Sequence, residues 1–339
     1  MGRTGRGNAR MGTPKVIFIL ALALGLAVGV YVLSGLLEEP PLPKVRGVVE
    51  TEAPVAWQGA DYVKKKRVTT MLFMGVDRRE QDADVAIFAR NGGQADFLFL
   101  LVIDDESDMV YPLHIDRDTM TDIAITTIMG RPAGTRNAQI CLSYGFGTTP
   151  AQSCELTREA VSGLLNGQGI DHYMSMNMGS IGDLNDAAGG VTVQMAEDLT
   201  VLNPAWTTGA TVTLHGYEAE EFVRARMSVG AGTNVERMAR QRAYLTGFRE
   251  ALLMGMKTNG ESYLQSLFKA IDAAAETDVS DQWLLDELWK ARKYQWQEIM
   301  TLDGEHAIGT NSFMECHVDP QSIEELIMRL YYKQKNADT

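Results

Sequence analysis

Three apolar runs decide the fold of this 339-residue chain: VTTMLFMGV at residues 68–76, FLFLLVI at 97–103 and MVYPLHI at 109–115. Each run is short, and charged residues lie close to it, as expected for buried strands. The runs are apolar on both faces, which is typical of strands covered by helices on each side of a sheet. Pro112 lies inside the third run and has no backbone N–H, so it predicts an edge or a bulge there.

The remaining pattern is mainly helical. We expect one strand at 191–195 and helices at 155–165, 181–188, 216–226 and 235–256. The region 256–339, which contains Trp283, Trp289 and Trp296, is predicted to be a helical C-terminal portion of uncertain role. The order of elements predicts an α/β fold with a central, mostly mixed β-sheet flanked by helices.

An uncharged stretch at residues 16–36 predicts a transmembrane helix before this domain. At about 1.5 Å per residue, it is long enough to cross the roughly 30 Å core of a bilayer. Basic residues precede it and acidic residues follow it, so residues 1–15 are expected in the cytoplasm and the main domain outside. A cleaved signal peptide is the alternative, although its apolar core would be shorter. The proline-containing stretch 37–66 is predicted to be a linker.

The formal net charge of −13 argues against non-specific binding to nucleic acid. Clustered arginines are therefore informative. One cluster lies within nineteen residues: Arg224, Arg226, Arg237, Arg240, Gln241 and Arg242. Arg237 and Gln241 are four residues apart and share a helix face. Such a set can bind a pyrophosphate through forked hydrogen bonds, or it can be an exposed basic helix face.

Two carboxylates lie at the ends of predicted strands. Asp77 follows the first run and Asp96 begins the second. If these strands are neighbours, both carboxylates can reach one Mg²⁺, which prefers oxygen ligands. The alternative is two solvated loop residues. Arg117 and Asp118 follow the third run, where they form part of the same region or a turn or helix cap.

Six short motifs occur in order: GVDRR (75–79), ADFLFLLVI (95–103), HIDRDTM (114–120), DAAGGV (186–191), VRARM (223–227) and RMARQR (237–242). Together, behind a predicted export anchor, they resemble the LytR-CpsA-Psr family of bacterial cell-envelope proteins. The resemblance implies a catalytic domain at 67–255. It implies transfer of an anionic glycopolymer from a polyprenyl-pyrophosphate carrier to peptidoglycan, on the outer face of the membrane.

The resemblance also implies roles for single residues. Asp77 and Asp96 would be metal ligands for Mg²⁺, and Asp118 would orient Arg117. Phosphate oxygens would be bound by Arg117, Arg224, Arg226, Arg237, Arg240 and Gln241, with Arg79 supporting them from behind.

The chain departs from the family pattern at two places. Asn234 stands where the family usually has an aspartate, and Asp116 replaces the proline that usually precedes the Arg-Asp pair. Asparagine is neutral and cannot act as a general base. Glu236 or Asp118 is then the candidate base. Otherwise the chain is a non-catalytic binder of lipid-linked pyrophosphates; a pyrophosphatase is a third reading.

Three cysteines complete the chemical inventory: Cys141, Cys154 and Cys316. A Cys141–Cys154 disulfide would close a short loop and contribute ~3 kcal/mol, so we consider the pair either bridged or free.

Overall fold

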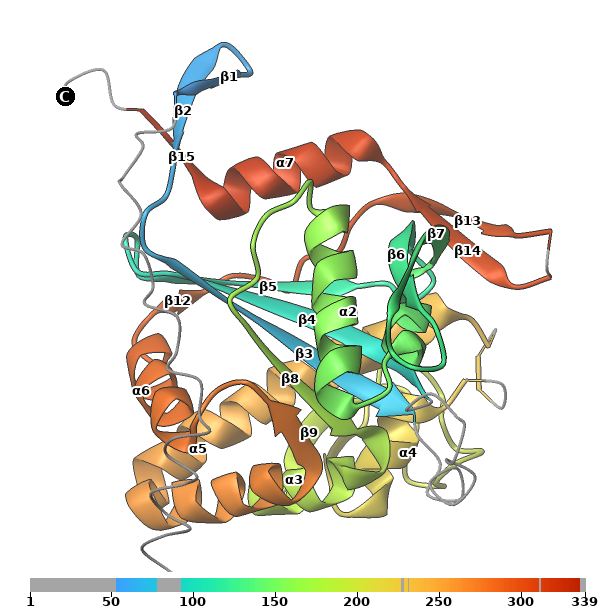
Figure 1. The fold of residues 1–339 in the computed structure, drawn as a ribbon. Coiled ribbons are helices and arrows are strands. Elements are labelled where there is room, and N and C mark those ends of the chain that lie inside the picture. The colour runs from blue at the N-terminus through green and yellow to red at the C-terminus, as the bar shows by residue number, and fades with distance from the viewer. Residues whose placement is uncertain (1–52, 78–92, 227–228, 231, 311, 336–339) are drawn as a thin grey trace, which may run out of the picture. The chain divides into compact units, whose positions relative to one another are not determined.

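The three apolar runs form neighbouring antiparallel strands in the computed structural model (Figure 1): β3 (Val68–Asp77), β4 (Gln94–Asp104) and β5 (Met109–Ile115). The structure describes residues 53–77, 93–226, 229–230, 232–310 and 312–335. The predicted span at 16–36, the tail at 1–15 and Arg79 lie outside these residues. Within the described ranges, no helix is both long and apolar enough to cross a membrane.

The central sheet has six strands in the order β11-β8-β3-β4-β5-β12. β8 (His172–Asn177) runs parallel to β3, and the short β12 (Gln295–Trp296) runs parallel to β5, so the sheet is mixed as predicted. β11 (Ala275–Thr277) is antiparallel to β8. Pro112 directs its carbonyl towards the β12 side, where it accepts a hydrogen bond from the Met300 N–H at 2.9 Å. Its missing N–H is therefore tolerated on the penultimate strand.

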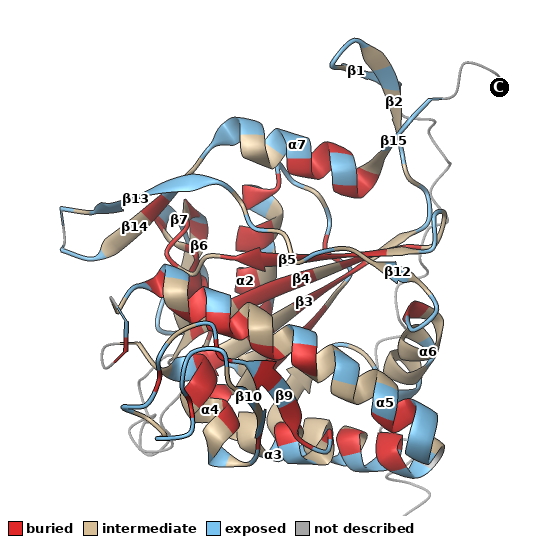
Figure 2. Cartoon of the chain, turned by 180° about the vertical axis from the view of Figure 1, so that it is seen from behind, coloured by how far each residue is buried: buried red, intermediate tan, exposed pale blue. Residues whose placement is uncertain are grey.

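Helices cover both faces of this sheet. One face packs against η2 (Ile140–Phe146), α2 (Pro150–Leu164) and α7 (Pro320–Tyr331), and together they form the main hydrophobic core. α5 (Asn234–Ala274) and α6 (Asp281–Ala291) lie on the other side. Figure 2 shows buried positions concentrated on the strands and on the inward sides of these helices.

A second core lies next to the sheet and supports the start of α5. It is built by α4 (Tyr217–Arg224), β9 (Val191–Gln194) and β10 (Thr211–Leu214), with the fully buried Trp206 among them. α3 (Ile181–Ala187) and η3 (Met178–Ser180) lead into this core. A further hairpin joins β6 (Met120–Thr126) to β7 (Pro132–Gln139).

The predicted linker at 37–66 needs correction where the structure describes it. Its end forms a hairpin of β1 (Val55–Trp57) and β2 (Ala60–Lys64), and β15 (Tyr332–Gln334) pairs with β2. The two strands are joined by Gln58 and Gly59, both with positive φ, as tight hairpins require. The rings of Trp57 and Tyr62 meet edge to face at 5.4 Å across the hairpin.

The prediction of a helical portion at 256–339 was wrong in part. α5 continues across residue 256 to Ala274, with one non-helical residue at Gly260. The region also supplies β11 and β12 to the central sheet, β15 to the first hairpin, and a separate hairpin of β13 (Gly304–Ile308) and β14 (Met314–Val318). The residues after Ala53 belong to one compact unit, so this portion is integral to the fold.

The bridged alternative for Cys141 and Cys154 was wrong, because all three cysteines are free and buried. The Cys154 thiol contacts Ser175 Oγ at 3.2 Å, whereas the Cys141 thiol lies 3.9 Å from Gln94 Oε1. Burial raises the pKa of each of these two thiols to about 12, so both remain protonated.

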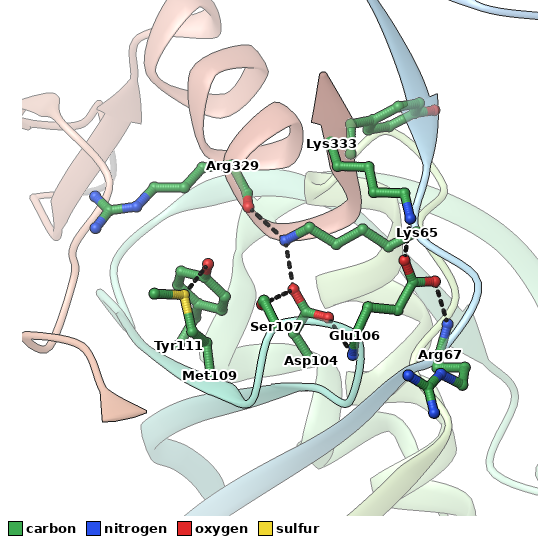
Figure 3. A pocket seen from close by; sticks show the side chains of 10 residues that line it. Lys65, Arg67, Asp104, Glu106, Ser107, Met109, Tyr111, Arg329 and Lys333 are labelled. Atoms are coloured by element: carbon green, nitrogen blue, oxygen red, sulfur yellow. Dashed lines mark hydrogen bonds and ion pairs between the residues drawn. The ribbon is translucent and has the colours of Figure 1, made fainter. Parts of the chain in front are cut away.

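A buried ion pair fixes the end of the sheet where β3 begins (Figure 3). Lys65 Nζ lies 3.1 Å from the Asp104 carboxylate, which also accepts hydrogen bonds from Ser107 Oγ and the Glu106 N–H. A cavity of about 560 Å³ adjoins this pair, with Lys333 and Glu106 paired on its wall. Both of its acidic residues are paired with lysines, and it lies at the opposite end of β3 and β4 from Asp77 and Asp96.

Replacing Asp104 should destabilise the fold. Burial alone would raise the Asp104 pKa, but hydrogen bonds from Ser107, Lys65 and Glu106, with the Lys65 charge, lower it overall. The Asp104 carboxylate therefore adds its full contribution to the free energy of unfolding above the unfolded pKa of about 3.9. That contribution is lost as pH falls through the lowered pKa of the folded state. We expect Asp104→Asn to cost roughly 2–3 kcal/mol at pH 7 in urea unfolding, with a smaller difference near pH 3.

Asp108→Asn is the matched control for this substitution. Asp108 is exposed and adopts a φ of 54°, which asparagine tolerates. The free energy of unfolding of the Asp108→Asn variant should differ from that of the natural chain by less than about 0.5 kcal/mol. Equal losses in the two variants would show that the buried pair has no special role.

Candidate active site

A β-bulge places Asp96 at the other end of the sheet. Gly75 is opposite Phe97 and Val76 is opposite Ala95, so Asp96 is the extra residue in β4. A Cβ on Gly75 would lie 2.9 Å from the Phe97 Cβ, which explains the glycine at this close approach. Bulges commonly re-aim a side chain, and here the re-aimed group is a carboxylate.

The Asp96 carboxylate contacts two arginines from different elements. Its Oδ1 is bonded to Arg117 Nη1, and its Oδ2 lies 3.6 Å from Arg237 Nη1. Arg117 comes just after β5, and Arg237 lies in the first turn of α5. Arg117 also bonds Asp118 Oδ1 at 3.3 Å and Gln94 Oε1 at 3.1 Å. The structure therefore brings together Asp96, Arg117, Asp118 and Arg237, as the sequence predicts.

The start of α5 is fixed by a capping box. The Thr233 hydroxyl accepts from the Glu236 N–H, and the Glu236 carboxylate accepts from the Thr233 N–H, both at 3.3 Å. This start aligns Arg237 and Gln241 on one buried face, where their exposures are 7% and 3%. Gln241 Nε2 donates to the Val223 carbonyl at 3.3 Å.

Three buried polar atoms at the start of α5 have no partner among the described residues: Arg237 Nε, Arg240 Nε and Gln241 Oε1. Unpaired buried polar groups carry a free-energy cost, so such groups mark places where a ligand can supply the missing partner.

Arg224 and Arg226 lie at and just beyond the C-terminal end of α4. Arg224 Nη2 lies 2.9 Å from Asp77 Oδ1, and its Nη1 pairs with Glu220 at 2.6 Å. Arg226 Nε donates to the Gly232 carbonyl at 3.2 Å. Arg226 is close enough to Arg237 to lower the pKa of that guanidinium.

Arg240 is oriented differently from its neighbours. It is 5% exposed, its Nη1 pairs with Glu197, and its Nη2 donates to the Ala225 carbonyl. These contacts tie α5 to the residue after α4 and to the segment after β9. Both terminal nitrogens of Arg240 have partners in this structure, and its predicted place in the substrate-binding group stays a prediction.

The electrostatics of the cluster favour an added anion. Burial lowers the Arg237 pKa most, Arg117 and Arg226 lower it further, and Asp96 opposes them. Burial together with Arg242 and Arg237 lowers the pKa of the nearby His114 to about 3, so His114 is neutral. Several guanidinium groups therefore lie within electrostatic range of one another despite the acidic chain, and an anion bound between them would relieve their repulsion.

Asp118 is a second buried carboxylate at the site, with 2% exposure. It accepts from Gln139 Nε2 at 3.2 Å in addition to Arg117. Burial raises its pKa, Arg117 opposes this shift, and Asp116 adds to it. Its Oδ2 has no partner within the described part of the chain.

The two departures from the family pattern are in direct contact. Asn234 Nδ2 donates to Asp116 Oδ1 at 2.6 Å, and Asn234 Oδ1 accepts from Arg237. An amide can donate to one neighbour and accept from the other, whereas an aspartate can only accept. Asn234 is therefore the residue type that matches a carboxylate at position 116.

Asp77 and Asp96 fit the donor set expected for Mg²⁺. They come from adjacent strands at one end of the sheet, with side chains 40% and 11% exposed. Both raise the pKa of Arg224, so both lie within its electrostatic range. Mg²⁺ commonly takes one or two carboxylates and keeps several waters. Whether these residues bind it stays a prediction.

Several residues of this site carried no signal in the sequence. Gln94, Gln139 and His306 are isolated polar residues without motif context, and they reach the site through pairing of strands and hairpins.

Together, fold and site define a mixed α/β protein with a cluster of arginines and carboxylates at one end of its sheet. The chain belongs to the LytR_cpsA_psr family, whose model matches residues 45–328. The resemblance drawn from the six motifs is confirmed.

Curated relatives are teichoic acid transferases. The chain is 27% identical over 227 residues to the polyisoprenyl-teichoic acid–peptidoglycan teichoic acid transferase TagU of Bacillus subtilis, covering 67% of this chain and 64% of that protein. It is 26% identical over 286 residues to the protein of the same name from Halalkalibacterium halodurans, covering 81% and 83%. In the first alignment the chain spans less than two thirds of its relative.

Solved structures share the fold. Protein gbs0355 from Streptococcus agalactiae matches with a TM-score of 0.62 and 20% identity, over 78% of this chain and 86% of that one. A structure titled "TagT bound to LI-WTA" matches with a TM-score of 0.59 and 17% identity, over 78% and 90%.

The Asn234–Asp116 contact predicts energetic coupling. In urea unfolding with EDTA present, Asn234→Asp should cost at least about 1 kcal/mol more in the natural chain than in an Asp116→Asn background. The reason is that the single change places two carboxylates side by side. Arg237 contacts residue 234 in both backgrounds, so its effect on the free energy of unfolding cancels when the two costs are compared.

A control cycle uses Asn137→Asp and Asp122→Asn, which alter the same kind of pair at 3.0 Å on the exposed β6–β7 hairpin. Solvent screening should hold that coupling below about 0.5 kcal/mol. Equal coupling free energies in the two cycles would contradict the idea that Asp116 and Asn234 depend on each other.

Proposed function

We propose that this protein transfers an anionic glycopolymer from a polyprenyl-pyrophosphate carrier to peptidoglycan. The main support is the contact of the Asp96 carboxylate with both Arg117 and the buried Arg237. Burial and neighbouring arginines lower the pKa of Arg237. A pyrophosphate suits guanidinium groups brought this close together. The names of the teichoic acid transferase relatives support transfer to peptidoglycan.

The substrate pyrophosphate would be bound by four arginines and one amide. Arg117 and Arg237 approach from the strand and helix sides, and Arg224 and Arg226 approach from the end of α4. Gln241 would bind a phosphate oxygen through its amide Nε2, which donates to the Val223 carbonyl in this structure. Guanidinium groups can form paired, charge-assisted hydrogen bonds to phosphate oxygens.

In the proposed reaction, a hydroxyl of peptidoglycan attacks the phosphorus nearest the glycan. The new phosphorus–oxygen bond forms as the bond to the bridging oxygen breaks, and polyprenyl phosphate leaves with that bonding pair. Phosphoryl transfer depends mainly on positioning and charge stabilisation, which the arginines supply. Mg²⁺ held by Asp77 and Asp96 would add charge neutralisation on the pyrophosphate oxygens.

The attacking hydroxyl must lose a proton, and Asp118 is the better of the two candidate acceptors. Glu236 is engaged in the capping box of α5. Asp118 is buried beside Arg117, with a raised pKa and an oxygen that has no partner among the described residues. A carboxylate with a raised pKa is a stronger base.

An apolar strip of the sheet suits the lipid part of the donor. Phe97 and Phe99 stack at 5.8 Å, and the Phe97 ring lies 5.1 Å from His114. His114 is in electrostatic range of Arg237 and Arg242, so this strip lies beside the arginine cluster; His114 and Phe99 are buried, and Phe97 is partly exposed. A membrane anchor at residues 16–36 would keep the site near a lipid-linked donor.

One observation favours a second function. Asn234 is neutral at a position that is usually acidic in the family, so a non-catalytic binder of lipid-linked pyrophosphates is the main competitor. A pyrophosphatase using water as acceptor is the third candidate. The three differ in their products.

The experiment incubates the full-length chain in detergent with a polyprenyl-pyrophosphate glycan, Mg²⁺ and peptidoglycan. Glycan joined to peptidoglycan is the expected product. Arg237→Lys should lower kcat/KM for transfer by about 10²–10³-fold, because lysine cannot reproduce the forked hydrogen bonds at a developing charge. Arg136→Lys, on an exposed strand, is the matched control and should keep natural activity.

Other products would contradict transfer. Free phosphorylated glycan would identify a hydrolase. Tight binding without either product, unchanged by Asn234→Asp, would identify a binder. Natural activity in Arg237→Lys would mean that the arginine cluster is not the reaction site.

The metal prediction has its own measurement. In the transfer assay, Asp77→Asn should raise the free Mg²⁺ concentration for half-maximal rate by about tenfold or more, because one ligand is lost. The exposed control Asp122→Asn should leave that concentration unchanged. A rate unaffected by EDTA would contradict a Mg²⁺ requirement.

A further inference from the structure

Three potential metal ligands from separate segments meet beside the arginine cluster. They are Asp116 after β5, His306 on β13 and Cys316 on β14, and one ligand atom from each lies within 4.8 Å of the others. Among the described residues, this is the one group of three or more histidine, cysteine and acidic side chains with such spacing. Neither the family motifs nor the proposed transfer reaction uses His306 or Cys316.

The strand register explains why these side chains converge. His306 and Cys316 are directly opposite each other in the antiparallel β13–β14 pair, so they lie on the same face of the hairpin. The Cys316 N–H donates to the Asp118 carbonyl at 2.8 Å, and Cys316 is bridged in parallel to Thr119. This contact docks β14 against the segment that carries Asp116.

Asp116 is already oriented as a ligand. Its Oδ1 accepts hydrogen bonds from Asn234 Nδ2 at 2.6 Å and from the Asp118 N–H at 2.8 Å. Its Oδ2 points to His306 Nε2 at 2.8 Å. One oxygen is thus fixed by outer partners while the other faces the remaining ligands, as in metal sites whose carboxylates are held by hydrogen bonds.

The donor set selects the kind of metal. One imidazole nitrogen, one thiolate sulfur and one carboxylate oxygen suit Zn²⁺, whereas Mg²⁺ takes oxygen ligands. A thiolate and a carboxylate together balance the charge of a divalent ion. The Cys316 side chain is buried and His306 is 33% exposed, so the group is enclosed but reachable from solvent.

We infer that Asp116, His306 and Cys316 form a binding site for Zn²⁺ with three protein ligands and a fourth position for water. The site joins the β13–β14 hairpin to the arginine cluster, because Asp116 is linked through Asn234 to Arg237. It is distinct from the oxygen ligands Asp77 and Asp96. Metal binding here does not depend on the proposed transferase activity.

The test measures metal binding by the full-length chain in detergent. After removal of metals with EDTA and dialysis, one equivalent of Zn²⁺ should bind in the presence of excess Mg²⁺. Co²⁺ should produce a thiolate-to-cobalt charge-transfer band. Cys316→Ser should abolish that band and weaken Zn²⁺ binding by at least about 100-fold, more than the loss of an outer partner. Cys154→Ser is the matched thiol control.

A second pair of variants guards against misfolding. His306→Gln alters a partly exposed side chain and should also weaken Zn²⁺ by at least about 100-fold, whereas His317→Gln on the same hairpin should bind normally. Zn²⁺ should raise the Tm of the natural chain and of His317→Gln, but not that of His306→Gln. Stoichiometric binding that is equal in the natural chain, Cys316→Ser and His306→Gln, or no binding at all, would overturn the inference.

Discussion

The active end of the molecule depends on one ionic contact, the Asp96 carboxylate between Arg117 and Arg237. The three residues come from a bulge in β4, the segment after β5 and the first turn of α5. Burying two guanidinium groups close together costs free energy unless a negative charge lies between them. Asp96 supplies that charge and so fixes the loop and the helix relative to the sheet. An arriving anion would find a preorganised site rather than one that must assemble.

The two ends of the central strands use charge in opposite ways. At one end, Lys65 and Asp104 neutralise each other and are held by further hydrogen bonds, which stabilises the entry into the sheet. At the other end, Arg117 and Arg237 share the Asp96 carboxylate, and the Arg237 pKa is lowered mainly by burial and further by Arg117 and Arg226. The chain as a whole carries −13, so the second end works against the overall field. One end of the strands is thus held by paired charges, whereas the other brings several guanidinium groups together around shared carboxylates.

The sequence predicts what depends on long apolar runs and fixed spacing. β3, β4, β5 and the start of α5 lie where expected; Asp96 and Arg117 meet because β4 and β5 are neighbours, and the start of α5 brings Arg237 to them. The β13–β14 hairpin could not be found, because its short strands are largely polar and exposed. Arg240 was assigned to the site by proximity in sequence, yet its side chain turns to Glu197. Cys141 and Cys154 are near in sequence, but they face different neighbours.

Asn234 has a different meaning once its surroundings are known. Alone, it is the loss of a carboxylate where the family usually has one. In the structure, Asp116 has replaced a proline and lies one hydrogen bond away, so a carboxylate remains in the site at a shifted position. From there it reaches His306 on a hairpin that the sequence placed outside the catalytic domain. The exchange of two residues therefore does more than remove a base. It connects the arginine cluster, through Asn234 and Asp116, to the C-terminal hairpin, and makes that hairpin part of the site.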